Sequence, residues 1–80
     1  MGMGKETFME DLAAVLEVDP DELQENFELN RDNWNSLSIV SAIVLIDEQF
    51  GVAIEGDKLR ECQSVGMLLN LIQEATGAPL

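Results

Sequence analysis

The sequence predicts an all-α protein, a small bundle of four helices of which three are main helices and one is short. Apolar residues recur at intervals of three and four along three segments, and capping residues, Gly or Pro bound these segments. The β-branched run Val52-Ala53-Ile54 has no second strand-like run to pair with, so we expect an extended connector there. Eighty residues that are 46% hydrophobic suffice for one core, so we expect a single domain over residues 1–80, with its core over about 5–76.

The first main helix is expected between about Lys5 and Val18, and its only expected role is to pack in the core. Asp19 suits a helix cap and Pro20 suits the first helical position, which predicts a short helical turn over about Pro20–Asn26. The apolar face of the first helix is formed by Phe8, Leu12, Val15 and Leu16.

The segment 27–33 is rich in Asn and Asp and has no sustained period, which predicts a loop. We expect Phe27 and Leu29 to pin this loop to the core. Trp34 is expected to cover the edge of the core, with its indole N–H directed to water or to a carbonyl.

The second main helix begins within the polar stretch Asn33–Ser36, continues for about fifteen residues without Gly or Pro, and ends at Gly51. Other apolar residues of the helix lie outside its expected core stripe and form a candidate partner surface. Alternatively, the preceding loop folds back and buries Val40 or Leu45. The core stripe is Ile39, Ile43, Ile46 and Phe50, and the residues outside it are Leu37, Val40, Val44 and, at its edge, Leu45.

Two further helices are expected after the connector. Asp57 can cap a short one over about Lys58–Cys62, and Ser64 can cap a longer one over about Val65–Ala75. Gly66 within the longer helix would allow close packing, and Gly77 with Pro79 ends it. The apolar face of the longer helix is formed by Val65, Leu68, Leu69, Leu71 and Ile72.

Composition excludes several classes of function. With 16 acidic and 4 basic residues the net charge is -12, which repels phosphate backbones and attracts basic protein surfaces, so we expect no nucleic-acid partner. Solubility alone would also favour such a charge. There is no His, and Cys62 stands alone, so we expect no metal site, no disulfide, no enzyme activity and a reducing, cytoplasmic location. Cys62 itself is expected to be a partly buried small apolar residue. No apolar run is long enough to span a bilayer, so we expect no insertion into membranes. We also expect the protein to be a monomer.

Ser36 lies at the cap or in the first turn of the second main helix. Backbone N–H groups lack partners there and the helix dipole is positive, so a phosphate ester would be stabilised. Phosphate attachment is therefore the chemistry that this serine can support. The alternative is that Asn35 or Ser36 only caps the helix.

Three segments of the chain occur together in a known family. They are Trp34-Asn35-Ser36-Leu37 with the helix that follows it to Phe50-Gly51-Val52, Val18-Asp19-Pro20-Asp21-Glu22-Leu23 upstream, and Ser64-Val65-Gly66-Met67-Leu68 downstream. In this order and spacing they resemble the acyl carrier proteins over nearly the whole chain. Asn35 departs from the pattern, because the family usually has Asp there, but Asn also caps and we expect carrier activity to survive.

The resemblance implies an acyl-carrier-like fold and a covalent 4'-phosphopantetheine arm on Ser36, flanked by Asn35 and Leu37. A phosphopantetheinyl transferase would attach the arm. Acyl intermediates would then ride on its thiol as thioesters, to be delivered to acyl-transferring or acyl-modifying enzymes of fatty acid, polyketide or related biosynthesis. The chain would thus be a carrier and a phosphoprotein.

The resemblance also implies two surfaces on the second main helix. Ser38 and Ser41 replace residues that are often acidic in relatives, so recognition should rely on shape and apolar contact. A peptidyl carrier is disfavoured because Gly-Gly-His/Asp-Ser is absent around the serine. The alternative from another class is an unmodified acidic helical protein-interaction module in which Ser36 only caps. The partner surface would be Leu37, Val40, Ser41, Val44, Asp47 and Glu48, and the acyl cleft would be lined by Ile39, Ile43 and Ile46.

Overall fold

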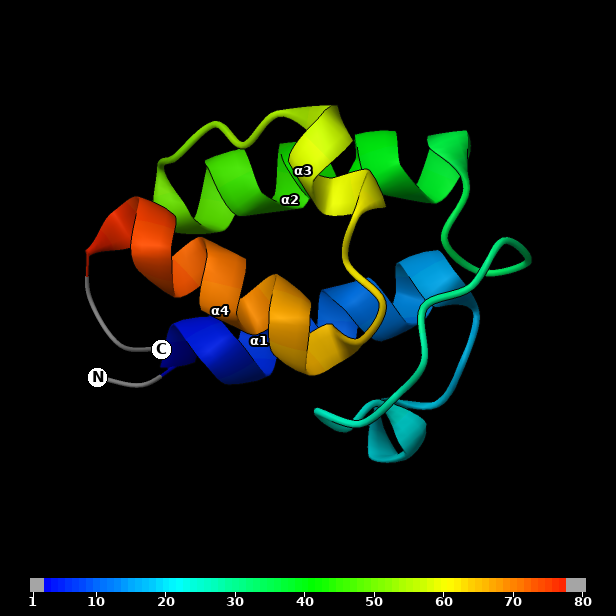
Figure 1. Ribbon diagram of the computed structural model, residues 1–80. Coiled ribbons are helices and arrows are strands. Elements are labelled where there is room, and N and C mark those ends of the chain that lie inside the picture. The colour runs from blue at the N-terminus through cyan, green and yellow to red at the C-terminus, as the bar shows by residue number, and fades with distance from the viewer. Residues whose placement is uncertain (1–2, 78–80) are drawn as a thin grey trace.

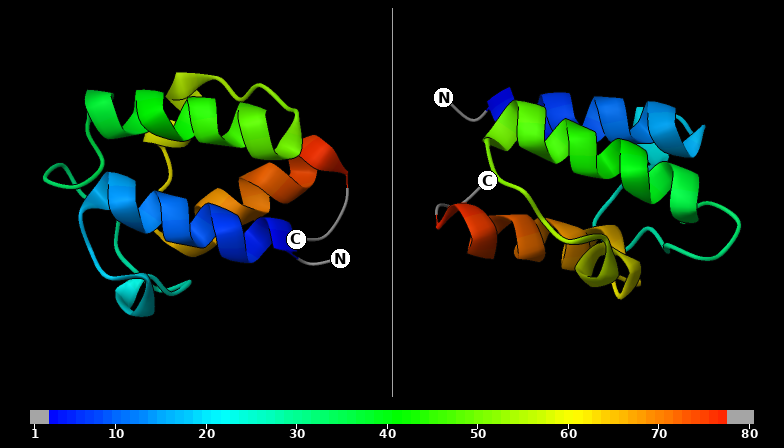
Figure 2. Two further views of the ribbon diagram at one scale, coloured as in Figure 1. Left: turned by 180° about the vertical axis from the view of Figure 1, so that it is seen from behind. Right: turned by 90° about the horizontal axis from the view of Figure 1, so that it is seen from above.

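The computed structural model describes residues 3–77, with side chains from residue 5 onward. In this part of the chain the all-α prediction is confirmed. Helix α2 (Ser36–Phe50) runs antiparallel to α1 (Met3–Leu16), and α4 (Val65–Thr76) packs against the same core, as Figures 1 and 2 show. None of the described helices is long and apolar enough to cross a bilayer. The elements are α1 (Met3–Leu16), the 3₁₀ turn η1 (Pro20–Glu22), α2 (Ser36–Phe50), α3 (Gly56–Arg60) and α4 (Val65–Thr76).

A single apolar core is shared by the three main helices. Phe8 and Leu12 of α1, Ile46 of α2, and Leu68 and Ile72 of α4 are all fully buried within it. The apolar faces expected for α1 and α4 are therefore confirmed except at Val15, which is only half-buried, whereas Ala13, which was not expected on the face, is fully buried. Because the core takes up one side of α2, the opposite side of that helix remains available to solvent.

The buried face of α2 is rotated from the predicted stripe. Ser38 and Ala42 are buried at its centre with Ile39 and Ile46. Two members of the predicted stripe, Ile43 and Phe50, are only half-buried, so the assignment was wrong by part of a turn. The prediction considered only large apolar residues, whereas small side chains at the centre of the face suit the close packing of α1 on α2.

Helix α1 ends at Leu16, two residues before the predicted end. Glu17 adopts a left-handed conformation with φ 60°, and the N–H groups of Glu17 and Val18 donate to the carbonyls of Ala14 (3.3 Å) and Ala13 (3.0 Å). This pair of bonds is a Schellman motif, which normally has Gly in the left-handed position. Because a glutamate occupies this position, no glycine marks the helix end in the sequence.

The short helices differ in extent from the predictions. The turn η1 stops at Glu22 rather than near Asn26, and the next residue, Leu23, is buried in the core. Helix α3 begins at Gly56, two residues earlier than expected, so Asp57 lies in its first turn and not at its cap. The connector 51–55 has no regular structure, as predicted.

The ends of α4 agree with the sequence. The Ser64 side chain caps it by accepting a first-turn N–H at 3.3 Å, and Gly77 ends it with φ 72°. The Gly66 N–H donates to the Glu25 carbonyl at 2.8 Å, and a Cβ on Gly66 would lie 3.1 Å from that oxygen. The close packing expected at Gly66 is therefore present. Pro79, the other expected stop signal, lies outside the described residues.

Candidate functional site

The loop that leads into α2 is ordered by two asparagines. The Asn30 Oδ1 accepts the N–H groups of Asp32 (2.9 Å) and Asn33 (3.1 Å). In return, the Asn33 Oδ1 accepts the Asn30 N–H at 2.9 Å, and the Asn33 Nδ2 donates to the Glu28 carbonyl at 3.1 Å. Asn side chains commonly replace backbone partners in turns in this way. The Asn-rich segment is thus a hydrogen-bonded turn that sets the direction in which the chain enters the helix.

The same loop is anchored to the C-terminal half of the chain. The buried Trp34 indole N–H donates to the Leu59 carbonyl at 2.7 Å. Of the two expected partners, water and a carbonyl, the structure therefore shows the carbonyl. The Leu29 N–H donates to the Gln63 carbonyl at 2.9 Å, and Leu29 itself is buried. Phe27 is half-buried against the core, so both residues pin the loop as predicted. These contacts hold the loop between the end of α3 and the start of α4.

The cap of α2 is Asn35 and not Ser36. The Asn35 Oδ1 accepts the N–H groups of Leu37 and Ser38, both at 3.1 Å. The Asn35 N–H donates to the Ser38 Oγ at 2.9 Å, and the Ser38 hydroxyl donates to the Asn33 carbonyl at 2.8 Å. Ser36 is then the first residue of the helix; it is exposed, and its hydroxyl makes no hydrogen bond among the described residues.

Ser38 is a residue of this site that the sequence analysis placed wrongly. It was noted only as a replacement for a residue that is often acidic, on a helix face expected to meet partner enzymes, but only 6% of it is exposed. The signal that could have located it is its position three residues after the cap, where a polar side chain can reach back to the N-cap N–H.

The surroundings of Ser36 favour an attached anion. It lies at the N-terminus of a 15-residue helix whose first turn contains no acidic residue. The positive end of the helix dipole therefore stabilises a phosphate at this point. No general base contacts the hydroxyl among the described residues, so the proton must be removed by a partner if Ser36 is to be esterified.

The side of α2 that faces away from the core exposes an apolar stripe. The exposed fractions are 78% for Leu37, 57% for Val40 and 49% for Val44. The loop does not fold back over Val40, whereas Leu45 is half-buried against the core and does not belong to the stripe. Ser41 is half-buried beside the stripe, and the exposed Asp47 and Glu48 follow at its C-terminal end.

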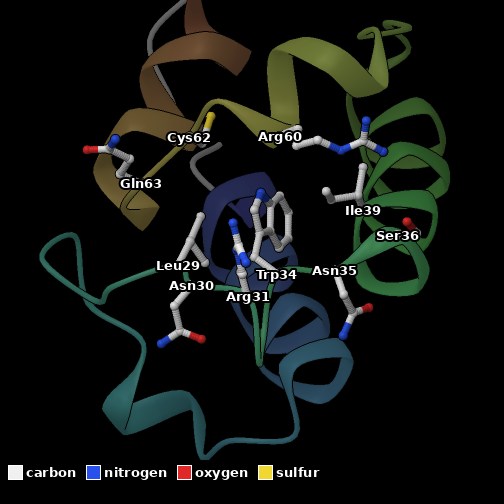
Figure 3. Close-up of a pocket in the computed structure, with 10 residues that line it drawn as sticks. All are labelled: Leu29, Asn30, Arg31, Trp34, Asn35, Ser36, Ile39, Arg60, Cys62 and Gln63. Carbon is white, nitrogen blue, oxygen red and sulfur yellow. The ribbon is translucent and has the colours of Figure 1, made fainter.

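A pocket of about 550 Å³ lies beside Ser36, between the loop and the end of α3. Figure 3 labels the ten residues that line it, including Trp34, Ile39 and Cys62. Of the three isoleucines expected to line an acyl cleft, only Ile39 lines this pocket. Ile46 is fully buried in the core, and Ile43 is half-buried near Gly56.

Cys62 is buried at the edge of this pocket, as expected for a small apolar residue. Burial, and secondarily the charge of Glu61, raise the pKa of its thiol above the ordinary value. The thiolate is therefore disfavoured, and Cys62 is poorly suited to act as a nucleophile.

Comparison with known proteins identifies the class of this site. The family model described as "Phosphopantetheine attachment site" matches residues 6–72, which include most of α1, all of α2 and α3, Ser36 and most of α4. No curated protein and no solved structure shows a significant match. The family match confirms the resemblance to acyl carrier proteins. The chain therefore belongs to the phosphopantetheine attachment-site family, as a carrier protein whose prosthetic group is 4'-phosphopantetheine.

Proposed function

We propose that Ser36 carries the 4'-phosphopantetheine arm and that the chain delivers acyl intermediates as thioesters on the thiol of that arm. The observation that carries the proposal is the exposed Ser36 at the first position of α2, whose hydroxyl makes no hydrogen bond to any residue from 5 to 77. Because Asn35 already caps the helix, esterifying Ser36 removes no hydrogen bond on which the fold depends.

The replacement of the family's usual Asp by Asn35 is compatible with this role. Asn35 provides the same side-chain oxygen to the Leu37 and Ser38 N–H groups. Since its amide is neutral, it adds no negative charge beside a phosphodiester on Ser36. The helix dipole then stabilises that phosphodiester without an opposing like charge at the cap.

The exposed side of α2 is the proposed docking surface for the phosphopantetheinyl transferase and for acyl-transferring or acyl-modifying enzymes. Its apolar part supplies area that becomes buried on contact, and the acids at its far end orient a basic partner. These enzymes belong to fatty acid, polyketide or related biosynthesis. They perform the chemistry, and the tethered arm raises the concentration of the acyl group at their active sites. The surface comprises Leu37, Val40, Ser41, Val44, Asp47 and Glu48.

The test is an intact-mass measurement after co-expression with a broad phosphopantetheinyl transferase. We expect a mass increase of one arm, mapped to Ser36 by fragmentation, and no increase in Ser36→Ala. Thr7→Ala, which removes an exposed hydroxyl from α1 outside the proposed docking surface, is the matched control and should load normally. Because Asn35 supplies the cap, Ser36→Ala should change the free energy of unfolding by less than about 0.5 kcal/mol. Loading that persists in Ser36→Ala would place the attachment at another residue.

An unmodified acidic helical protein-interaction module is the second candidate, because the apolar stripe of α2 is exposed whether or not Ser36 is modified. An unchanged mass, under conditions that fully modify a known carrier in the same cells, would favour this module over the carrier.

A further inference from the structure

We infer that the pocket beside Ser36 receives a carboxylate-bearing acyl group and that Arg31 and Arg60 bind its carboxylate. This inference rests on the proposed attachment of the arm at Ser36, which lines the same pocket. At about 550 Å³ the pocket is within the range that holds small organic ligands. It therefore has room for a short acyl group.

The first argument is the distribution of charge. The chain contains 16 acidic and only 4 basic residues, yet two of the four basic residues line this pocket and none of its ten lining residues is acidic. By contrast, the neighbouring cavity between α3 and α4 is lined by Glu61 and Glu74 as well as Lys58. The lining of the pocket beside Ser36 thus has two positive side chains and no negative one, on a strongly negative protein. A simple alkyl chain gains nothing from two guanidinium groups, whereas a carboxylate gains charge-assisted hydrogen bonds.

The second argument is that both arginines have donors to spare. Among the residues that the structure describes, Arg60 pairs only with Asp57, at 3.7 Å and with both side chains largely exposed, which makes the pair weak. Arg31 forms no ion pair within residues 5–77. Neither guanidinium is therefore committed to holding the fold together, and both can turn to a ligand.

The third argument is the wall that lies between the charges. Trp34 and Ile39 line the pocket, and in Figure 3 Arg60 extends toward Ile39 on α2 while Arg31 is drawn beside the Trp34 indole. The indole is held in place by its bond to the Leu59 carbonyl. An apolar wall flanked by cations suits a ligand with a short carbon chain that ends in a carboxylate.

The arm itself contains a second anion, the phosphodiester on Ser36, and the experiment must separate the two. We would load the chain with three arms: unacylated, succinyl, and succinamoyl, which has nearly the same size but a neutral end. The acyl groups would be joined through an amide in place of the thioester, so that neither is lost by hydrolysis. Nuclear magnetic resonance would follow the indole N–H of Trp34, the only tryptophan in the chain, and the arginine side-chain N–H groups.

The succinyl arm should shift the Trp34 and arginine signals relative to the unacylated arm, and the succinamoyl arm should not. Added salt should reduce the difference between the two cargoes, because the pocket is open to solvent. The difference should shrink in Arg31→Gln and in Arg60→Gln and vanish in the double variant. Lys58→Gln is the matched control: it removes the same charge from α3 but does not line this pocket, so the difference should persist.

Three results would overturn the inference. Equal shifts with both cargoes would mean that the pocket does not sense charge. If the unacylated arm alone produced the full shift of the Trp34 and arginine signals, the arginines would bind the phosphodiester and not the cargo. If the difference between the two cargoes persisted in the double variant, the arginines would not bind the carboxylate. Intact mass, measured first, keeps the two proposals apart: an unloaded Ser36 refutes the attachment, whereas a loaded chain without the cargo difference refutes only the carboxylate pocket.

Discussion

Replacing Ser38 with alanine should destabilise the start of α2, although the change removes only one oxygen atom. That oxygen accepts the Asn35 N–H at 2.9 Å and its proton is donated to the Asn33 carbonyl at 2.8 Å. Ser38 is only 6% exposed, so bulk water has little access to the space that its hydroxyl occupies. Ser38→Ala leaves one donor and one acceptor without their partner at the point where the loop becomes the helix.

The expected loss follows from these two groups. An unsatisfied buried polar group costs about 1 to 3 kcal/mol, and because Asn35 is exposed, water can satisfy part of this demand, so we take about 2 kcal/mol for both together. Alanine regains about 0.5 kcal/mol through its higher helix propensity. The net decrease in the free energy of unfolding should be about 1.5 kcal/mol. For a domain of this size that corresponds to a decrease in Tm of about 6 to 12 °C.

Urea denaturation followed by far-UV circular dichroism would measure the change, with an unchanged m value expected. Ser41→Ala is the control, because Ser41 lies on the same helix, is half-buried and makes no hydrogen bond among the described residues. That variant should stay within about 0.5 kcal/mol of the parent. If Ser38→Ala and Ser41→Ala were equally stable, the Ser38 bonds would contribute nothing and our account of the helix start would be wrong.

Three further predictions concern the docking surface, the core and the cysteine. Val44→Glu should slow acyl transfer to partner enzymes and leave the unfolding free energy unchanged; normal transfer with every partner would place docking elsewhere. Phe50→Ala removes a ring that packs edge-on against the Phe8 ring, with 5.4 Å between the ring centroids. It should lower the free energy of unfolding, measured by urea denaturation, by about 3 kcal/mol, the low end of the range for Phe because the ring is half-buried. A loss below about 1 kcal/mol would mean that the ring contributes little to the core. Because burial and the Glu61 charge raise the pKa of the Cys62 thiol, the folded state binds its proton more tightly, so stability should fall as pH rises above the ordinary pKa of 9.0. Cys62→Ala should flatten this decrease, and an unchanged slope would assign it to other groups.

Much of the fold could be predicted because its signals are local. The limits of α2 follow from Asn35 and Gly51, whose cap bonds involve residues within four positions. The apolar periodicity of α1 and α4 likewise located their buried faces. The end of α1 at Glu17 was missed, because a non-glycine residue adopts the left-handed conformation there. The buried face of α2 was misplaced, because its centre is occupied by small residues that a count of large apolar residues overlooks.

The features of the candidate site likewise fall into those set by local sequence and those set by tertiary packing. Ser36 could be placed at the start of α2, the cap could be narrowed to Asn35 or Ser36, and the exposed stripe could be proposed, because a helix places residues three and four apart on one side and leaves its first N–H groups without partners. The bond from the Trp34 indole to Leu59 and the pocket shared by Arg31 and Arg60 depend on how the loop packs against α3. Such contacts join residues far apart in the chain, and no local spacing records them. For that reason the sequence could indicate the serine that we propose as the attachment point of the arm, whereas only the packed structure shows which charges line the pocket beside that serine.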